Sequence, residues 1–313
     1  MRLVTFVPKR GATPRVGIVR EGYQVVDLTQ AGSKPPFDPE DMVSLIAAGA
    51  RGRAWLRQAT ARAKKTVPLG KVKLLAPIPR PHKNVFCVGW NYVEHFEEGK
   101  RALKHAQELP SHPAFFSKVP TTVIGPYDAI PFDPEVNQTL DWEAELGVII
   151  GRGGRSIAES DAMKHVFGYT VVNDVSVRYI QRRHGGQWFK GKSVDGTCPM
   201  GPWIATADDV PDPHQLRIAS RVNGDTKQDS NTNCMYFKIP RIIAELSYGL
   251  TLEPGDIIAT GTPAGVGHAR TPPEFMKAGD MLETEVYGVG LLRNRIGDWP
   301  PSRQGARKSK NNN

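Results

Sequence analysis

Residues 141–151 read DWEAELGVIIG, and the interpretation of the chain begins with this stretch. Its apolar part, 147–150, predicts a buried strand. Residues two apart in a strand point to the same side, so Glu143 and Glu145 are expected to present their carboxylates together. Such a pair is costly in a core unless a cation or several donors neutralise it. We therefore expect either a metal site or the solvated face of an outer strand.

A third acidic residue follows the next apolar segment, 165–174, which reads HVFGYTVVND. Asp174 ends this segment and stands before VSVRYIQ, where it could be the N-cap of a helix. A cap and a metal ligand are compatible roles, so both stay open. Oxygen ligands alone suit a hard cation such as Mg²⁺ or Mn²⁺ better than zinc.

The rest of the sequence alternates short apolar segments with turn residues. Its 31 glycines and 26 prolines are spread along 313 residues, which favours many short strands joined by tight turns. Strands are expected at 2–11, 12–22, 23–30, 84–92, 199–206, 216–224, 256–263 and 281–296, and helices at 42–46, 54–63, 95–108 and 239–249. We predict a β-rich α+β protein with a small N-terminal domain at 1–75, a larger domain at 76–300 and a disordered basic tail at 301–313.

Composition and charge limit the possible partners. The net charge is +9, and the segment 42–93 contains no acidic residue. No helix-turn-helix, zinc-finger or RNA-binding motif accompanies this basic stretch, so a nucleic-acid partner is not indicated. The three cysteines lack C-x-x-C spacing, which argues against a disulfide framework or a zinc site. No apolar run has the length of a membrane span or a signal peptide. We expect a cytoplasmic protein without a membrane partner.

Two further motifs carry possible chemistry. On a helix His95 and Glu98 are neighbours on one face, so the carboxylate can orient the imidazole and make it a general base. An exposed helix surface would explain the same spacing. Lys192, in WFKGKSVD, could face a cleft and stabilise negative charge, or it could be an ordinary loop lysine. The glycine-rich turn after 256–263 could hold an anionic group on its backbone amides.

Together these motifs resemble the fumarylacetoacetate hydrolase family. The matching segments are CVGWNYVEHFEE, DWEAELGVIIG, FGYTVVNDVSVRYIQ, WFKGKSVD, NGDTKQDSNT and PGDIIATGTPAGVG, which span about 84–297. The resemblance implies a mixed β-sandwich roll, preceded here by a small N-terminal β-domain, in a homodimer with one Mg²⁺ or Mn²⁺ per subunit. One departure is the long stretch 96–114, which we expect to fold over the site when substrate binds.

The resemblance also implies a role for each site residue. Glu143, Glu145 and Asp174 would be the metal ligands. His95 with Glu98 would activate water, and Lys192 would stabilise the oxyanion or act as an acid. The expected substrate contacts are Tyr92, Arg178, Gln181, Lys192 and Thr262, with Arg182 and Arg183 as possible anchors for a second anionic end.

These roles predict hydrolysis of a carbon–carbon bond in an acylpyruvate-like 2,4-diketo acid, giving pyruvate or a substituted pyruvate and a carboxylic acid. The substrate would be a small anionic keto acid. Oxaloacetate-type decarboxylation and keto–enol or 2-hydroxy-diene-dioate isomerisation are the main alternatives, because each passes through an enolate. A metal-binding homologue without turnover is a further possibility.

Overall fold

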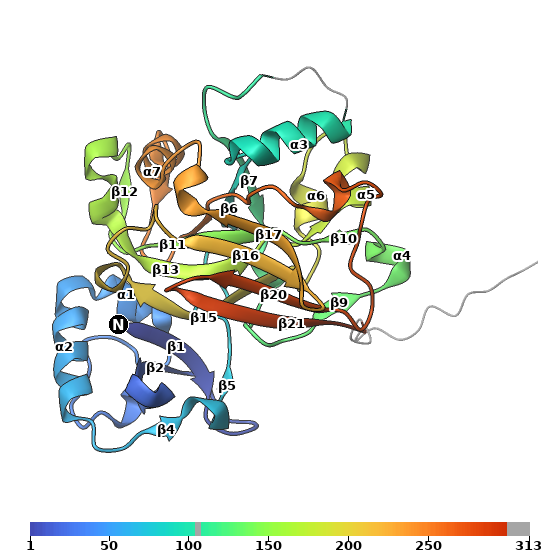
Figure 1. The fold of residues 1–313 in the computed structure, drawn as a ribbon. Helices are drawn as coiled ribbons and strands as arrows, with labels where there is room; N and C mark the ends of the chain where they lie inside the picture. The colour runs from blue at the N-terminus through green and yellow to red at the C-terminus, as the bar shows by residue number, and fades with distance from the viewer. Residues whose placement is uncertain (104–107, 299–313) are drawn as a thin grey trace, which may run out of the picture.

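A computed structural model describes residues 1–103 and 108–298 of the chain (Figure 1). The tail predicted to be disordered, 301–313, lies outside the described residues, as do positions 104–107 of the predicted helix and of the stretch expected to cover the site. The described part is rich in strands and also contains helices, which confirms the predicted α+β class.

The N-terminal segment forms the predicted antiparallel strands and two helices at one end of the molecule (Figure 1). Its elements are β1 (Arg2–Val7), β2 (Arg15–Arg20), β3 (Gln24–Asp27), α1 (Met42–Ala47), α2 (Gly49–Arg62), β4 (Val67–Pro68) and β5 (Lys73–Leu74). Helix α1 begins where the Asp41 carboxylate accepts hydrogen bonds from the amides of Val43 and Ser44.

The largest sheet continues from this segment into the rest of the chain. Its main path runs β4-β3-β2-β1-β15-β13-β11-β19-β6-β7. The added strands are β6 (Val85–Gly89), β7 (Ala114–Lys118), β11 (Ala144–Ile150), β13 (Val166–Asn173), β15 (Cys198–Thr206) and β19 (Ile257–Ala259). Strand β1 pairs antiparallel with β15, where Leu3 lies opposite Ile204. The domain boundary near residue 75 stays a prediction.

A second sheet packs on the first and closes the core between them. Its order is β17-β16-β20-β21-β9, with β9 (Ile130–Phe132), β16 (Arg217–Val222), β17 (Asp225–Asn231), β20 (Met281–Val286) and β21 (Gly290–Asp298). Leu146 and Val148 of β11 share one buried cluster with Ile218, Val286 and Leu292 of the second sheet. Alternate residues of facing strands thus fill the space between the two sheets.

Helices α3 (Val93–Leu103), α5 (Arg178–Arg183) and α6 (Phe189–Lys192) gather beyond one end of the sheets (Figure 1). The remaining short elements are β8 (Val123–Ile124), α4 (Pro134–Asn137), β10 (Leu140–Asp141), β12 (Gly154–Arg155), β14 (Ser176–Val177), α7 (Ile239–Ser247), β18 (Thr251–Leu252) and the 3₁₀ turns η1 (Glu21–Tyr23), η2 (Leu28–Gln30), η3 (Leu69–Lys71), η4 (Pro120–Thr122), η5 (Glu159–His165), η6 (Ala207–Asp209), η7 (Thr232–Cys234) and η8 (Gly267–Ala269). Within residues 1–103 and 108–298, no helix combines the length and the apolar character needed to cross a membrane.

Candidate active site

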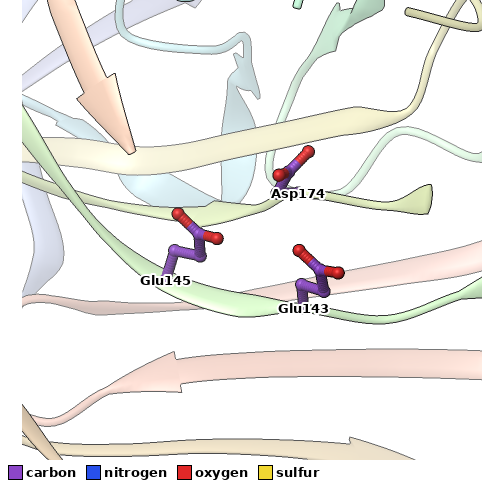
Figure 2. A group of neighbouring side chains, drawn as sticks. All are labelled: Glu143, Glu145 and Asp174. Atoms are coloured by element: carbon purple, nitrogen blue, oxygen red, sulfur yellow. The ribbon is translucent and has the colours of Figure 1, made fainter. Parts of the chain in front are cut away.

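Three buried carboxylates meet where β11 begins and β13 ends. Glu143 precedes β11, Glu145 lies within it, and Asp174 follows β13. The two strands pair with Ala144 opposite Asn173, so Asp174 lies beside Glu143, and its amide donates to the Glu143 carbonyl at 2.9 Å. One oxygen from each acid lies within 4.8 Å of the others (Figure 2). The side-by-side glutamates expected from the sequence are found in the core and not on a solvated face.

The positive charges around these three acids do not fully balance their negative charges. The Lys192 ammonium lies 2.6 Å from a Glu143 oxygen and 2.7 Å from an Asp174 oxygen. Glu145 accepts a hydrogen bond from the Gly261 amide at 2.8 Å. Burial, and then repulsion from Asp174 and Glu143, raises the pKa of Glu145 well above its usual range. A nearby positive charge would reverse this, and the all-oxygen donor set suits Mg²⁺ or Mn²⁺.

A second lysine, which the sequence analysis did not single out, lies behind the acids. The side chain of Lys118 is completely buried, and its ammonium lies 2.9 Å from an Asp174 oxygen and donates to the Val175 carbonyl at 3.0 Å. It lies at the end of β7, in AFFSK. A lone lysine after an aromatic pair gives little signal in a sequence, because most lysines are exposed.

The predicted pairing of His95 and Glu98 is present on α3. Nδ1 of His95 lies 2.9 Å from a Glu98 carboxylate oxygen. That carboxylate also accepts hydrogen bonds from the amides of Gly265, at 2.9 Å, and Val266. The glycine-rich turn predicted to hold an anionic group therefore holds Glu98. Gly265 has φ +104°, and a Cβ there would lie 2.2 Å from the Lys227 carbonyl oxygen, so the position requires glycine.

Arg178 connects the acids to a second buried carboxylate. Helix α5 begins at Arg178 after Val177, so the possible helix cap at Asp174 is wrong. The guanidinium donates to Asp141 at 2.7 Å and to Glu143 at 2.6 Å. Burial alone would raise the pKa of Glu143, but Lys192 and Arg178 outweigh it and lower this pKa.

Asp141 and His268 were also missed by the sequence analysis. Asp141 is completely buried, and one of its oxygens lies 3.1 Å from Nδ1 of His268. Burial and the neighbouring Arg178 lower the pKa of His268. Asp141 precedes the Glu143 motif by two residues, and this i, i+2 spacing was the available signal; nothing in the sequence around His268 marks it.

Several of the side chains described above line a cavity of about 260 Å³, although Glu98, Lys118, Asp141 and Asp174 lie outside its lining. Of the residues expected to take part in the chemistry, those lining it are His95, Glu143, Glu145, Arg178, Gln181, Arg182, Lys192 and Thr262. Val88, Trp90, Phe116 and Trp188 form an apolar wall, and His268 also lines the cavity. Gly89 allows this wall to close, because a Cβ there would lie 2.3 Å from the Trp188 ring.

Other expected contacts are placed differently. Tyr92 is completely buried, does not line the cavity, and its hydroxyl has no hydrogen-bond partner within residues 1–103 and 108–298. Arg183 lies over the ring of Tyr179, 5.9 Å from its centroid, outside the cavity lining. The Thr262 hydroxyl donates to the Ala144 carbonyl at 2.9 Å, so its hydrogen is already used.

Comparison with known proteins gives consistent results. Residues 84–297 match the model of the family described as fumarylacetoacetate (FAA) hydrolase, C-terminal. The oxaloacetate tautomerase YisK of Bacillus subtilis (strain 168) is 43% identical over 90% of this chain and 96% of its own. The mitochondrial oxaloacetate tautomerase FAHD2A of Homo sapiens is 42% identical over 95% of this chain and 91% of its own.

A solved structure shows the same architecture. The maleylpyruvate hydrolase of Sphingobium sp. SYK-6, in complex with manganese(II) and pyruvate, superposes with a TM-score of 0.76 and 32% identity. The match covers 96% of this chain and all of the other. With the predicted fold and the buried carboxylates in place, the chain belongs to the fumarylacetoacetate hydrolase family.

Proposed function

We propose that this protein is a metal-dependent tautomerase that interconverts the keto and enol forms of oxaloacetate or a closely related 2-keto dicarboxylate. The observation that carries the proposal is that His95, backed by the Glu98 carboxylate, opens onto the same cavity as Glu143 and Glu145. The similarity to two oxaloacetate tautomerases over nearly the whole chain supports this choice of reaction.

Glu143, Glu145 and Asp174 would hold the cation. A bound Mg²⁺ or Mn²⁺ would polarise the 2-keto group as a Lewis acid and orient the substrate. The fit rests on the oxygen-only donor set and on the raised pKa of Glu145, whose negative charge has too little compensation from its neighbours.

His95 would move the proton. With Nδ1 held by Glu98, the other ring nitrogen is available to a substrate in the cavity. It would take a proton from C3 of the keto form as the C3–H bond breaks and a carbon–carbon double bond forms. Glu98 would stabilise the imidazolium, and a proton returned to the C2 oxygen would complete the enol.

Lys192 would stabilise the negative charge that develops on the C2 oxygen. Its side chain is 2% exposed, and Asp174 and Glu143 raise its pKa against the opposing effect of burial. It therefore stays a charged donor inside the site. A buried ammonium directed at a developing oxyanion stabilises it more than a solvated one would.

The lining of the cavity includes a cation suited to a second anionic group. Arg182 lines the cavity and forms no salt bridge with the rest of the described chain. Arg178 is already bound to Asp141 and Glu143. Arg182 is therefore the better candidate to bind the C4 carboxylate of oxaloacetate, and Arg183, outside the lining, is not needed for it.

Hydrolysis of an acylpyruvate is the second candidate, because the same His95 and Glu98 pair can activate water. Water would add to the C4 carbonyl after giving a proton to His95. The C3–C4 bond would then break, its electron pair would form the pyruvate enolate, and the proton would pass to C3. The structural similarity to maleylpyruvate hydrolase supports this reaction.

One set of assays separates these reactions. The approach of oxaloacetate to keto–enol equilibrium is followed by enol absorbance, with EDTA and with added Mg²⁺ or Mn²⁺. Pyruvate release from acylpyruvates and CO₂ release from oxaloacetate are measured in parallel. We expect metal-dependent acceleration of tautomerisation. Acylpyruvate cleavage without it would favour the hydrolase, CO₂ release alone a decarboxylase, and no turnover with metal bound would favour a binding protein.

A further inference from the structure

Four consecutive backbone amides, at residues 265–268, bind two carboxylates from distant parts of the chain. The first two amides donate to Glu98 on α3, with 2.9 Å between the Gly265 nitrogen and a carboxylate oxygen. The next two, of Gly267 and His268, donate to Asp141 on β10 at 2.7 Å and 3.1 Å. This turn, which we call the 265–268 amide run, therefore connects α3 to β10.

Each carboxylate also holds a residue that faces the cavity. Glu98 lies 2.9 Å from Nδ1 of His95, the proposed base. Asp141 accepts a hydrogen bond from Nε of Arg178 at 2.7 Å. A continuous path of hydrogen bonds thus runs from His95 through Glu98, the 265–268 amide run and Asp141 to Arg178.

Close packing around Gly267 and Asp141 restricts movement of this hydrogen-bonded path. A Cβ on Gly267 would lie 2.0 Å from the Glu274 carbonyl oxygen and 2.7 Å from an Asp141 oxygen, so the backbone packs closely against that acid. Asp141 is completely buried. Its other oxygen accepts hydrogen bonds from Nε of Arg178 and from the backbone amide of His268, and it also lies 3.1 Å from Nδ1 of His268. A displacement of Asp141 must therefore move the turn as well.

We propose that Asp141 is a positioning residue for the reaction. It fixes the 265–268 amide run, which fixes Glu98 and with it the orientation of His95, and it holds Arg178 directly. The inference rests on the proposed function for the reaction assayed, and the path itself is independent of which reaction that is. No hydrogen bond joins Asp141 to Glu98 within the described residues, so the influence must pass through the turn.

The test is a double-mutant cycle between Asp141→Asn and Glu98→Gln. The asparagine keeps the size of the side chain. Its NH₂ group, however, would face hydrogen-bond donors, the amides of Gly267 and His268 or Arg178, and this repulsion should disturb the turn. We expect Asp141→Asn to lower kcat for tautomerisation about tenfold in the parent and less than about twofold in Glu98→Gln, because coupled residues are non-additive. A change in KM, which reports the direct contact with Arg178, should persist in both backgrounds.

Asp256→Asn is the matched control. Asp256 is also buried and holds a cation and a turn amide, accepting from Lys83 at 3.0 Å and from the Glu253 amide at 2.8 Å. It lies before β19 and does not line the cavity. Its replacement should lower the melting temperature and leave kcat unchanged in both backgrounds.

Hydrogen exchange of the metal-free protein provides a readout without turnover. Asp141→Asn should speed amide exchange in peptides covering 93–101 as well as in those covering 264–269, whereas Asp256→Asn should leave both unchanged. An equal loss of kcat in both backgrounds, or faster exchange confined to 264–269, would overturn the inference. A parent enzyme inactive on oxaloacetate and on related 2-keto dicarboxylates would overturn the proposed function alone, and the exchange data would still decide the role of Asp141.

Discussion

The buried acids of the cavity and the more accessible acids of the second sheet contrast in how they are paired. On the outer face of that sheet, Arg221 binds Glu283 at 2.9 Å and Glu285 at 2.6 Å, and Arg217 binds Asp229 at 2.7 Å. Every one of these carboxylates has an arginine partner in contact with water. In the cavity region, buried Glu143 and Asp174 share two lysines and an arginine, and Glu145 has no salt bridge within the described residues.

The difference shows what each set can do. Exposed pairs are screened by water and contribute little to stability. Burial makes unbalanced charge costly, so we expect the three buried acids, with one oxygen of each within 4.8 Å of the others, to lower the stability of the metal-free protein. The following predictions test this contrast, beginning with the largest expected effect.

Glu145→Gln should remove a proposed metal ligand, the one acid of the three that has no lysine or arginine partner within the described residues. We expect activity to fall with metal affinity, by at least about 100-fold, because changes even in the groups that support metal ligands cost about 10- to 100-fold. The metal-free variant should be no less stable than the parent, since burial and the neighbouring acids already disfavour the charged form of Glu145. Calorimetric metal titration and thermal melting measure the two effects.

The matched control on the second sheet is Glu285→Gln, which makes the same replacement at a glutamate that pairs with Arg221 and not with the cavity. It should leave metal affinity unchanged. A Glu145→Gln protein that binds Mn²⁺ as tightly as the parent would remove Glu145 from the ligand set.

His95→Ala should lower kcat by about 10² to 10⁴, the usual contribution of a general acid or base. Metal affinity should be retained, because His95 is separate from the carboxylate set. The control is His112→Ala, which breaks an exposed histidine–glutamate pair of 3.3 Å with Glu245. Steady-state kinetics on both variants decide, and full activity in His95→Ala would rule out His95 as the base.

Metal binding should stabilise the folded protein. A ligand at 100 times its Kd adds about 2.7 kcal/mol, so Mg²⁺ or Mn²⁺ should raise the melting temperature of the parent. At the same metal concentration Glu145→Gln, whose affinity is expected to be at least about 100-fold weaker, should gain less than about 0.5 kcal/mol. Melting curves with EDTA as reference measure this; equal stabilisation of both proteins would indicate binding elsewhere, for example on the exposed acids.

Arg221→Ala should have the smallest effect, about 0.2–1 kcal/mol of stability and no change in kcat. Hydrogen bonding to Arg221 lowers the pKa of Glu283 below its ordinary value of 4.5. A pKa lowered in the folded state adds stability above pH 4.5 that is lost as the pH falls through the folded pKa. Denaturant unfolding at neutral and acidic pH should therefore show the variant and the parent converging in acid.

Much of the architecture could be predicted from local sequence patterns. The strand β11 follows from its continuous apolar run, and the proximity of Glu143 to Glu145 follows from strand geometry. The position of Asp174 beside them depends on the pairing of β11 with β13, which a single sequence does not specify. The resemblance to the fumarylacetoacetate hydrolase family was what grouped Asp174 with Glu143 and Glu145 as metal ligands.

Residues missed in the sequence share one property. Lys118, Asp141 and His268 belong to different elements and acquire their roles through tertiary contacts, with Lys118 against Asp174 and His268 against Asp141. Tyr92 shows the opposite case, since a residue within a strong motif became part of the core. Motifs predict which elements meet, but the direction of each side chain depends on the packed structure.

The pairing of β1 with β15 has a consequence for dissecting the molecule. Leu3 pairs with Ile204 across the two strands, and the Thr206 amide donates to the Met1 carbonyl at 2.9 Å. Removing residues 1–75 would expose the last residues of β15 as an unprotected sheet edge, a template for pairing with other chains. We therefore expect residues 76–298 produced alone to aggregate more readily than the whole chain, unless another segment covers that edge of β15.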